Sequence, residues 1–522
     1  MNLFYLTTFP PLVLAVLIFV LGDRYRKAVR CLVGLGAIHC LLVGLTLPIL
    51  YSLAGTKTPS SWKFVTEIWF LNNSGLGING KFGLDGLGLI MAMLSGLVGG
   101  AALLTALLES NRPRSYFALL LIMVGALFGA FASLDLFYMY VFHEFALVPT
   151  FLLMWLWGRT PDKKRQALQT AIYLNVGALL ILVGLIWVRF LPGVESFDIT
   201  ALFDVNVAGA DTFGAKLVPW MLIVGFGILS TVWPFHGWAP GCYMTAPVPA
   251  VMLHAGVLKA FGIYGLFRLA SVLGLDSTSG LVHVVSWLAV ANIVFGGLIA
   301  LRQKNLNLTF AYGSIAHVGI VLLGLCGGTE MSWTGAIVAM LANGIWAALA
   351  FGTVGVLEAR FKTSEIPMLT GLGRRAPWLA SMLVVVGFAG CGLPGFLTFA
   401  GEALVLLGAW EIPQLRLHVI FMVLGVLVVA AVYLLIMIRK TVHGPADHVK
   451  CLEIPWLERI PAFILAGMLL LGGLYPYGVV KMASSFERPR RFTGASLVYC
   501  NGEGAQWEKL EPISSGLLKS SK

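Results

Sequence analysis

The sequence predicts an all-α polytopic membrane protein with about fourteen transmembrane helices in a single membrane domain, residues 1–522. Of its 522 residues, 58% are hydrophobic and only 11% are charged, whereas about 25% of the residues of a soluble domain are charged. Apolar segments of about 20 residues, the length that crosses a bilayer, follow one another along the whole chain. The sixty glycines also fit, because small residues let membrane helices approach one another closely.

Fourteen apolar segments meet the length criterion: 3–22, 31–54, 85–108, 115–133, 135–158, 167–190, 215–233, 245–272, 279–301, 308–327, 332–357, 376–409, 415–438 and 458–481. The segment 376–409 is long enough to be broken in the middle. The polar stretches between segments are short, so no soluble domain is expected. In 55–84, alternating apolar residues around Asn79-Gly80 predict either a short hairpin or a simple surface loop.

Basic residues gather in loops that fall on one side of the membrane, among them 24–30, 109–115, 159–166 and 358–365. By the positive-inside rule this side is cytoplasmic, and an even number of helices then places both termini outside. The net charge of +11 is explained by these loops rather than by a nucleic-acid partner. The first apolar segment has no clear cleavage site and is predicted to be a retained helix.

Two segments carry helix-breaking residues in mid-span. One is WPFHGWAPG (233–241), which continues through 245–250, and the other is GCGLPGF (390–396). The backbone groups freed by such breaks are tolerated where protein or water satisfies them, and paired broken helices point to a transport site. A packing kink is the alternative for either break taken alone.

Three charged side chains lie deep inside apolar segments: Glu144, Lys259 and Glu402. A charge at the centre of a bilayer costs at least about 3 kcal/mol, so such residues usually line an ion path or pair with one another. When buried ionisable groups are close, they titrate together, so a charge that moves at one group changes its neighbour. The three residues therefore predict a protein that moves protons or other ions.

The sequence predicts no cofactor and no metal in this chain. Its seven cysteines form no CxxC pair, and several lie within apolar segments. It has no dinucleotide-binding fingerprint after a strand, no P-loop, and no haem or iron–sulfur spacing.

Four motifs carry a resemblance to a known family: HEFALVP (143–149), WPFHGWAP (233–240), AYGSIAHVG (311–319) and GLPGFLTFAGEALVLLGAW (392–410). They resemble the antiporter-like membrane subunits of respiratory complex I, of the subunit M or chain 4 type, which are related to Mrp antiporters. GLDGLGL (83–89) is similar to the start of that family's third helix. The motifs run in order from about residue 80 to 440, and they also recur in membrane-bound hydrogenases and formate hydrogenlyases.

The resemblance implies fourteen helices that contain two inverted five-helix repeats, each with one broken helix. It divides the chain into N-terminal helices (1–114), a first repeat (115–272), a second repeat (279–438), and a C-terminal loop, last helix and tail (439–522). It also implies that buried Glu, Lys and His side chains near the bilayer midplane conduct protons through internal water.

Site residues follow by position. Glu144 matches the glutamate of the family's fifth helix, and Glu402 matches the glutamate after the second break, where a proton would leave. His317, within AYGSIAHVG, matches the histidine of the corresponding family segment. His236 matches the family's histidine beside the first break. A structural ion pair is the alternative role for Glu144, and a satisfied core group is the alternative for His317. For His236 the alternative is that it caps or tethers backbone groups freed by the break. His254, five residues before Lys259, is a further candidate for the path.

The chain departs from the family pattern at basic positions. The lysine that usually precedes the first break is Leu229 here, and the next family lysine aligns with Ala260 rather than Lys259. One residue is about 100° around an ideal helix, and a π-bulge or an alignment shift would restore the direction. Asn307 and Asn343 replace two further basic residues. Either Lys259 becomes the partner of Glu144, or Glu144 is protonated and silent.

The prediction is a proton-translocating, antiporter-like subunit of a complex I-like NADH:quinone oxidoreductase in the bacterial inner membrane. It would act as a translocase without a redox centre, and the flavin, iron–sulfur clusters and quinone would belong to partner subunits. Lipids and other membrane subunits, including further antiporter-like ones, are the expected partners, and nucleic acid is not. The alternatives are a subunit of a related hydrogenase, Mrp antiporter or inorganic-carbon uptake complex, and a scaffold paralogue that no longer pumps.

Overall fold

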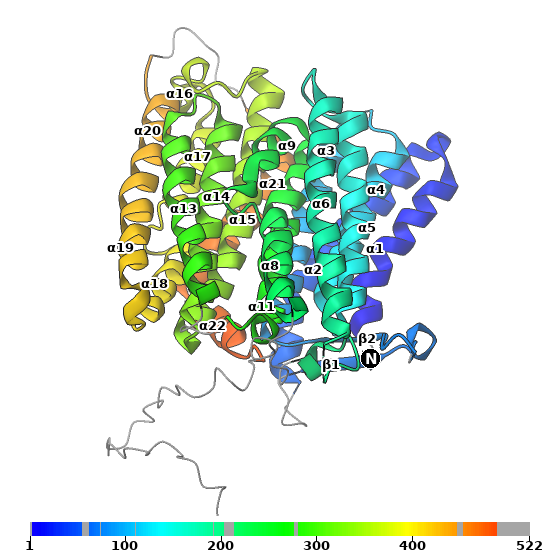
Figure 1. Cartoon of the computed structure of the whole chain (residues 1–522). Helices are drawn as coiled ribbons and strands as arrows, with labels where there is room; N and C mark the ends of the chain where they lie inside the picture. Colours follow the sequence, from blue (N-terminus) through cyan, green and yellow to red (C-terminus); the bar gives the residue numbers. More distant parts are fainter. Residues whose placement is uncertain are drawn as a thin grey trace, which may run out of the picture.

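The protein is a bundle of helices that run between two opposite ends (Figure 1). The computed structural model describes residues 3–54, 62–73, 75–109, 111–191, 193–202, 213–275, 280–445 and 453–487. Within these ranges, twelve helical segments are long and apolar enough to cross a membrane. The all-α membrane fold is thus confirmed, whereas the total of fourteen helices stays a prediction. The C-terminal tail beyond residue 487 lies outside the described residues.

The long helices are α1 (Leu3–Leu21), α2 (Arg26–Leu53), α3 (Gly86–Leu108), α4 (Arg114–Ala132), α5 (Leu136–Trp157), α6 (Lys163–Arg189), α13 (Gly280–Arg302), α14 (Leu306–Gly327), α15 (Glu330–Phe361) and α21 (Trp456–Leu474). The main shorter helices are α8 (Phe213–Leu229), α9 (Ala239–Thr245), α10 (Val248–Leu253), α11 (Ala260–Arg268), α17 (Pro377–Gly390), α18 (Leu397–Trp410), α19 (Arg416–Val423), α20 (Ala431–Val442) and α22 (Pro476–Ser484). Side-chain oxygens of Asp85, Asp135, Asn305 and Thr329 accept N–H groups in the first turns of α3, α5, α14 and α15. These caps satisfy donors that a helix start leaves free.

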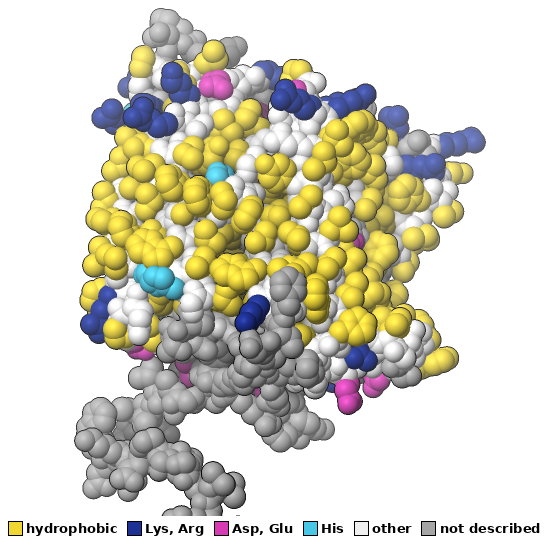
Figure 2. Space-filling model, in the orientation of Figure 1, with side chains coloured by type: hydrophobic (Ala, Val, Ile, Leu, Met, Phe, Trp, Pro, Cys, Tyr) yellow, Lys and Arg dark blue, Asp and Glu magenta, His cyan; other side chains and the backbone are white. Residues whose placement is uncertain are grey.

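The bundle has an inner and an outer layer of helices. Helices α3, α4, α14 and α15 are almost wholly buried, while α1, α2, α5 and α6 expose many large apolar side chains. In a bilayer such an apolar surface faces lipid, because each helix satisfies its own backbone polar groups. Figure 2 shows this apolar band, with Lys and Arg gathered at one end.

That end, called the cytoplasmic end below, carries α16 (Leu372–Arg375) and the C-terminus of α20, and the N-terminus lies at the other end beside two strands (Figure 1). The placement of the basic loops and of the N-terminus agrees with the predicted orientation.

The two strands form the predicted hairpin: β1 (Lys63–Glu67) pairs antiparallel with β2 (Lys81–Leu84). Asn79-Gly80, however, is not the turn between them, because it directly precedes β2. The Asn79 N–H donates to the carboxylate of Asp135 at 2.8 Å, and the Gly80 N–H donates to Asn72 Oδ1 at 2.7 Å. Asn79 therefore attaches the hairpin to the start of α5, and Gly80 bonds within the hairpin segment.

Both predicted helix breaks are present. The first lies between the end of α8 at Leu229 and α9, and it contains the short helix η3 (Phe235–Trp238). The second separates α17 from α18. In addition, a π-helix interrupts the segment after each break: η4 (His254–Leu258) joins α10 to α11, and η7 (Leu424–Ala430) joins α19 to α20. This recurrence supports the division into repeats at 115–272 and 279–438, which stays a prediction.

A fully buried ion pair joins the ends of two helices that are far apart in sequence. Both terminal nitrogens of Arg268 donate to the carboxylate of Asp85, each at 2.7 Å, and both side chains have no exposed surface. The rings of Tyr264 and Trp62 lie 4.7 and 4.8 Å from the guanidinium. Asp85 also caps α3 through the Gly88 N–H. The pair therefore fixes the start of α3 against the end of α11.

Replacing Arg268 with methionine should destabilise the protein by about 3–5 kcal/mol, because the Asp85 carboxylate would remain buried without a counter-charge. Thermal unfolding of the detergent-purified protein measures this change. The double variant Asp85→Asn/Arg268→Met keeps the helix cap and removes both charges, so it should recover most of the loss. A single variant as stable as the wild type would contradict this role.

A buried polar row as the candidate functional site

The predicted site residues lie on six segments of the bundle: α5, η3, η4 with the adjoining Lys259, α14, α15 and α18. Glu144 projects from α5 and has its neighbour His143 beside it, with Glu144 Oε1 3.5 Å from His143 Nδ1. The Glu144 side chain is 30% exposed, but Oε1 itself is buried and has no hydrogen-bond partner. The His143 ring stacks on Phe261 of α11 at 4.1 Å between centroids. His143 and Tyr140, both on α5, are ionisable neighbours of Glu144.

Lys259 lies immediately after the π-helix η4, and its N–H donates to the carbonyl of His254 at 3.0 Å, five residues earlier. This π-helix is the π-bulge that was one of the two ways to restore the expected direction of the Lys259 side chain. The Lys259 ammonium donates to the hydroxyl of Ser314 on α14 and reaches the Ser314 carbonyl at 3.3 Å. It forms no ion pair with Glu144, so direct pairing of these two described residues, one of the two open readings, is not observed.

His317 and Glu402 form the other end of the row. His317 Nδ1 on α14 lies 3.3 Å from Glu402 Oε1 on α18, and both side chains are more than nine-tenths buried. His317 follows Ser314 by three residues and therefore lies one helical turn along α14. The Trp346 ring covers His317 at 5.0 Å between centroids. Lys259 and Glu402 are thus connected through a single helix.

The second break is shaped to receive Glu402. A Cβ atom on Gly392 would come within 2.1 Å of Glu402 Oε2, and Gly392 has a φ of +64°. Only glycine adopts this backbone conformation at little cost and leaves room for the carboxylate. The GCGLPGF motif therefore brings the backbone against Glu402 instead of merely bending the helix.

His254 lies in the π-helix η4, five residues before Lys259. It is fully buried, and neither ring nitrogen has a hydrogen-bond partner among the described residues. The rings of Trp238 and Tyr243 enclose it at 5.1 and 5.9 Å. Direct contacts thus define two parts of the row, Glu144 with His143, and Lys259 with Ser314 followed by His317 and Glu402.

Leu229 stands where the resemblance places a lysine. Its side chain is buried at the end of α8, and no charged group replaces it there among the described residues. The break that follows is held by Asn292 of α13, whose amide donates to the Thr231 and Ile315 carbonyls at 3.3 and 3.1 Å and whose oxygen accepts the Trp233 N–H. Asn292 thus satisfies backbone groups that the break frees.

The remaining candidates lie beside the row or away from it. Asn343 on α15 is buried, and its Oδ1 has no hydrogen-bond partner among the described residues. His236 in η3 is half-buried and lies near Tyr312. Asn307 is remote from the row, because it is in the first turn of α14 at the cytoplasmic end, where its amide donates to Glu358.

Several buried polar atoms of the row have no hydrogen-bond partner among the described residues, including His254 Nδ1 and Nε2 and His317 Nε2. Buried polar atoms are normally satisfied by protein groups or by ordered water. The row therefore has the chemistry of a hydrated path along which protons can move between ionisable groups. No group of three or more potential metal ligands occurs in the described part of the chain.

Sequence reasoning missed Ser314 and Asn292. Ser314 lies one turn before His317 within AYGSIAHVG, so its spacing was an available signal. No sequence signal pointed to Asn292, because an asparagine in an apolar helix does not indicate which break it contacts.

Comparison with known proteins agrees with this architecture. The family profile described as "NADH:quinone oxidoreductase/Mrp antiporter, TM" matches residues 133–428, more than half of the chain. NADH-quinone oxidoreductase subunit M of Pseudomonas aeruginosa is 32% identical over 438 residues, which cover 81% of this chain and 84% of that protein. A chain of respiratory complex I from Thermus thermophilus superimposes with a TM-score of 0.81 at 26% identity, covering 94% of this chain and all of that one.

A chain of the Mrp complex from Dietzia shares the fold alone, with a TM-score of 0.78 at 19% identity over 93% of this chain and 96% of that one. The sequence identity to subunit M, together with the family profile that spans both breaks and both ends of the polar row, settles the family. The chain belongs to the NADH:quinone oxidoreductase/Mrp antiporter transmembrane family.

Proposed function

We propose that this chain is the proton-translocating, antiporter-like membrane subunit of a complex I-like NADH:quinone oxidoreductase, in the position that subunit M holds in the relatives. It would carry no redox centre, and electron transfer would occur in partner subunits that hold the flavin, iron–sulfur clusters and quinone. Its direct partners would be other membrane subunits of the complex, including further antiporter-like ones, and lipid.

The observation that carries the proposal is the contact of Lys259 with Ser314, one turn from the His317–Glu402 pair. Through this contact a single ionisable chain crosses from the predicted first repeat to the second. An ammonium in a dry core is costly unless it is hydrogen-bonded and able to exchange charge with its neighbours. This placement supports a conducting role better than a purely structural one.

The path would be rerouted around Leu229. In place of the usual lysine, His143 and His254 would relay charge between Glu144 and Lys259, because both histidines are buried and each lies on the same segment as one of these two residues. Histidine suits this task because it takes up and releases a proton near neutral pH. Asn343 would bond water beside the path and not titrate itself.

The second candidate is a scaffold paralogue that occupies an antiporter-subunit position without pumping. Leu229, Asn307 and Asn343 favour it, because three basic positions of the family are uncharged here. A subunit of a related hydrogenase, Mrp antiporter or inorganic-carbon uptake complex would contain the same row, and the subunits that copurify with the chain would distinguish these assemblies.

The test is Glu144→Gln in the copurified complex reconstituted into liposomes, with proton uptake measured per electron transferred. We expect coupled uptake to fall by about tenfold or more, because a positioned proton-transfer group is lost. Glu453→Gln, an exposed carboxylate in a cytoplasmic loop, is the matched control and should pump normally. If an intact Glu144→Gln complex also pumps normally, the relay through α5 is rejected and the result favours the scaffold function for this chain.

A further inference from the structure

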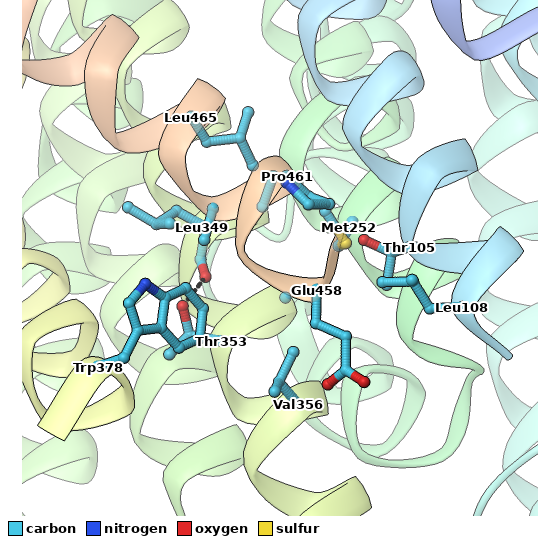
Figure 3. Close-up of a pocket in the computed structure, with 13 residues that line it drawn as sticks. Thr105, Leu108, Met252, Leu349, Thr353, Val356, Trp378, Glu458, Pro461 and Leu465 are labelled. Carbon is cyan, nitrogen blue, oxygen red and sulfur yellow. Dashed lines mark hydrogen bonds between the residues drawn. The ribbon is translucent and has the colours of Figure 1, made fainter. Parts of the chain in front are cut away.

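A charged vestibule opens at the cytoplasmic end between the two predicted repeats. It has a volume of about 1000 Å³ and is bounded by the ends of α3 and α15, the start of α10, and the loops before α6 and α14. Its floor continues into a narrow apolar crevice (Figure 3), with which it shares Thr105, Leu108, Val356 and Glu458. Glu458 lies at the polar end of that crevice, opposite Val356.

Three carboxylates that line the vestibule are each paired with an arginine. Glu109 pairs with Arg112 in the same loop, and Glu458 of α21 pairs with Arg360 of α15. The third pair, Glu358 with Arg159, is different, because Arg159 comes from the loop between α5 and α6 while Glu358 lies on α15. It therefore connects the two predicted repeats.

Arg159 holds the end of the first broken helix. Its Nε donates to the Ala246 carbonyl at 2.7 Å and its Nη2 to the Tyr243 carbonyl at 2.8 Å, while Nη1 faces Glu358. The Arg159 N–H also donates to the Thr245 carbonyl at 2.6 Å. The guanidinium thus binds carbonyls at the end of α9 through Nε and Nη2 and binds Glu358 through Nη1.

Through its other oxygen, Glu358 contacts the start of α14, the helix that carries Ser314 and His317. Its Oε1 accepts the Asn307 amide at 2.6 Å, and Asn307 precedes Ser314 by seven residues on α14, about 10 Å along the helix and on the same face. The side chain is 23% exposed to the vestibule. The same carboxylate is therefore within reach of cytoplasmic water, of the first break, and of the helix that contacts Lys259.

We infer that Glu358 is a proton-operated latch: its carboxylate holds Arg159 on the first break, and a proton taken from vestibule water releases it. The proton binds a carboxylate oxygen, so Glu358 becomes neutral and Arg159 loses its charged partner. Charge-assisted hydrogen bonds are about twice as strong as neutral ones, so the end of α9 loosens when the latch is protonated. The inference rests on the proposed function and extends it to control of proton access from the cytoplasm.

Other charged groups line the same vestibule and bear on this latch: Glu109, Arg112, Arg360, Lys362, Glu365 and Glu458. Glu458 is the matched control, since it too is paired with an arginine and lines the vestibule but does not contact the first break or α14.

The experiment is hydrogen–deuterium exchange of the amides of residues 239–246 in the purified complex, at neutral and at mildly acidic pH. Because acid slows intrinsic amide exchange, exchange is expressed as protection relative to an unstructured peptide at the same pH, and in wild type we expect the protection of this segment to fall on acidification. In Glu358→Gln we expect the protection to be low at both pH values, at least about tenfold below that of neutral wild type, as expected for the loss of a charge-assisted hydrogen bond. Glu458→Gln should behave as wild type, and Glu358→Asp should restore part of the pH response.

Equal exchange in wild type and Glu358→Gln, or an equal effect of Glu458→Gln, would overturn the latch. This readout does not require pumping, so it separates the two proposals. If Glu144→Gln pumps normally while residues 239–246 still respond to Glu358, the latch stands and the pumping proposal fails. If Glu144→Gln abolishes pumping while Glu358→Gln leaves exchange unchanged, the latch fails alone.

Discussion

Lys259→Met should lower coupled proton uptake by about 10²-fold or more while the complex still assembles, because it removes a positioned proton-transfer group from the middle of the row. Methionine has a similar length and fits an apolar core, so the packing of η4 against α14 should survive. What is lost is the ammonium that contacts Ser314. Proton uptake per electron in liposomes measures the effect.

Two further variants make this expectation specific. Lys259→Arg retains a positive charge that is not released in proteins, so it should assemble normally and still fail to conduct. Lys440→Met removes an exposed lysine at the end of α20 and should leave uptake unchanged. If Lys259→Arg pumps as wild type, Lys259 serves as a fixed charge, and the relay through it is wrong.

Glu402→Gln should have an effect of similar size, about 10²-fold on coupled uptake, because glutamine cannot take up the proton that His317 would pass on. The two groups are 3.3 Å apart, and both side chains are more than nine-tenths buried. Residues that act in series as one unit are strongly non-additive. The double variant Glu402→Gln/His317→Gln should therefore be little worse than Glu402→Gln alone.

Glu411→Gln, nine residues further along the same segment and exposed, is the control for Glu402→Gln. Normal proton uptake in an intact Glu402→Gln complex would contradict an exit path through the second break. An additive double variant would indicate instead that His317 and Glu402 act in separate steps.

The sequence predicted the fold class and both breaks because these depend on local properties. Apolar segments of membrane-spanning length and mid-span Pro and Gly are readable without knowing any contact. The hairpin at β1 and β2 was predicted for the same reason, but its connection was wrong. Asn79-Gly80 contacts Asp135 and Asn72 instead of forming the turn, and those partners are not evident from the dipeptide.

The site was only partly predictable. Glu144, Lys259, His317 and Glu402 stood out because ionisable groups are rare in apolar segments. Their partners did not. Pairing of Glu144 with Lys259 was one of two open alternatives, and the structure instead has His143 beside Glu144 and Ser314 beside Lys259. The direction of Lys259 depends on the π-helix η4, a change of one residue in hydrogen-bond register that composition does not reveal.

Taken alone, the sequence determined that this chain is a membrane protein with buried charges, which side of it carries the basic loops, and where its helices break. These features follow from residue type and from spacing along one helix. Only the tertiary structure decided which of the distant charges are neighbours, since the Lys259–Ser314, His317–Glu402 and Arg159–Glu358 contacts join segments far apart in the chain. A helix face limits which residues can point inward, but packing against another helix determines what they meet.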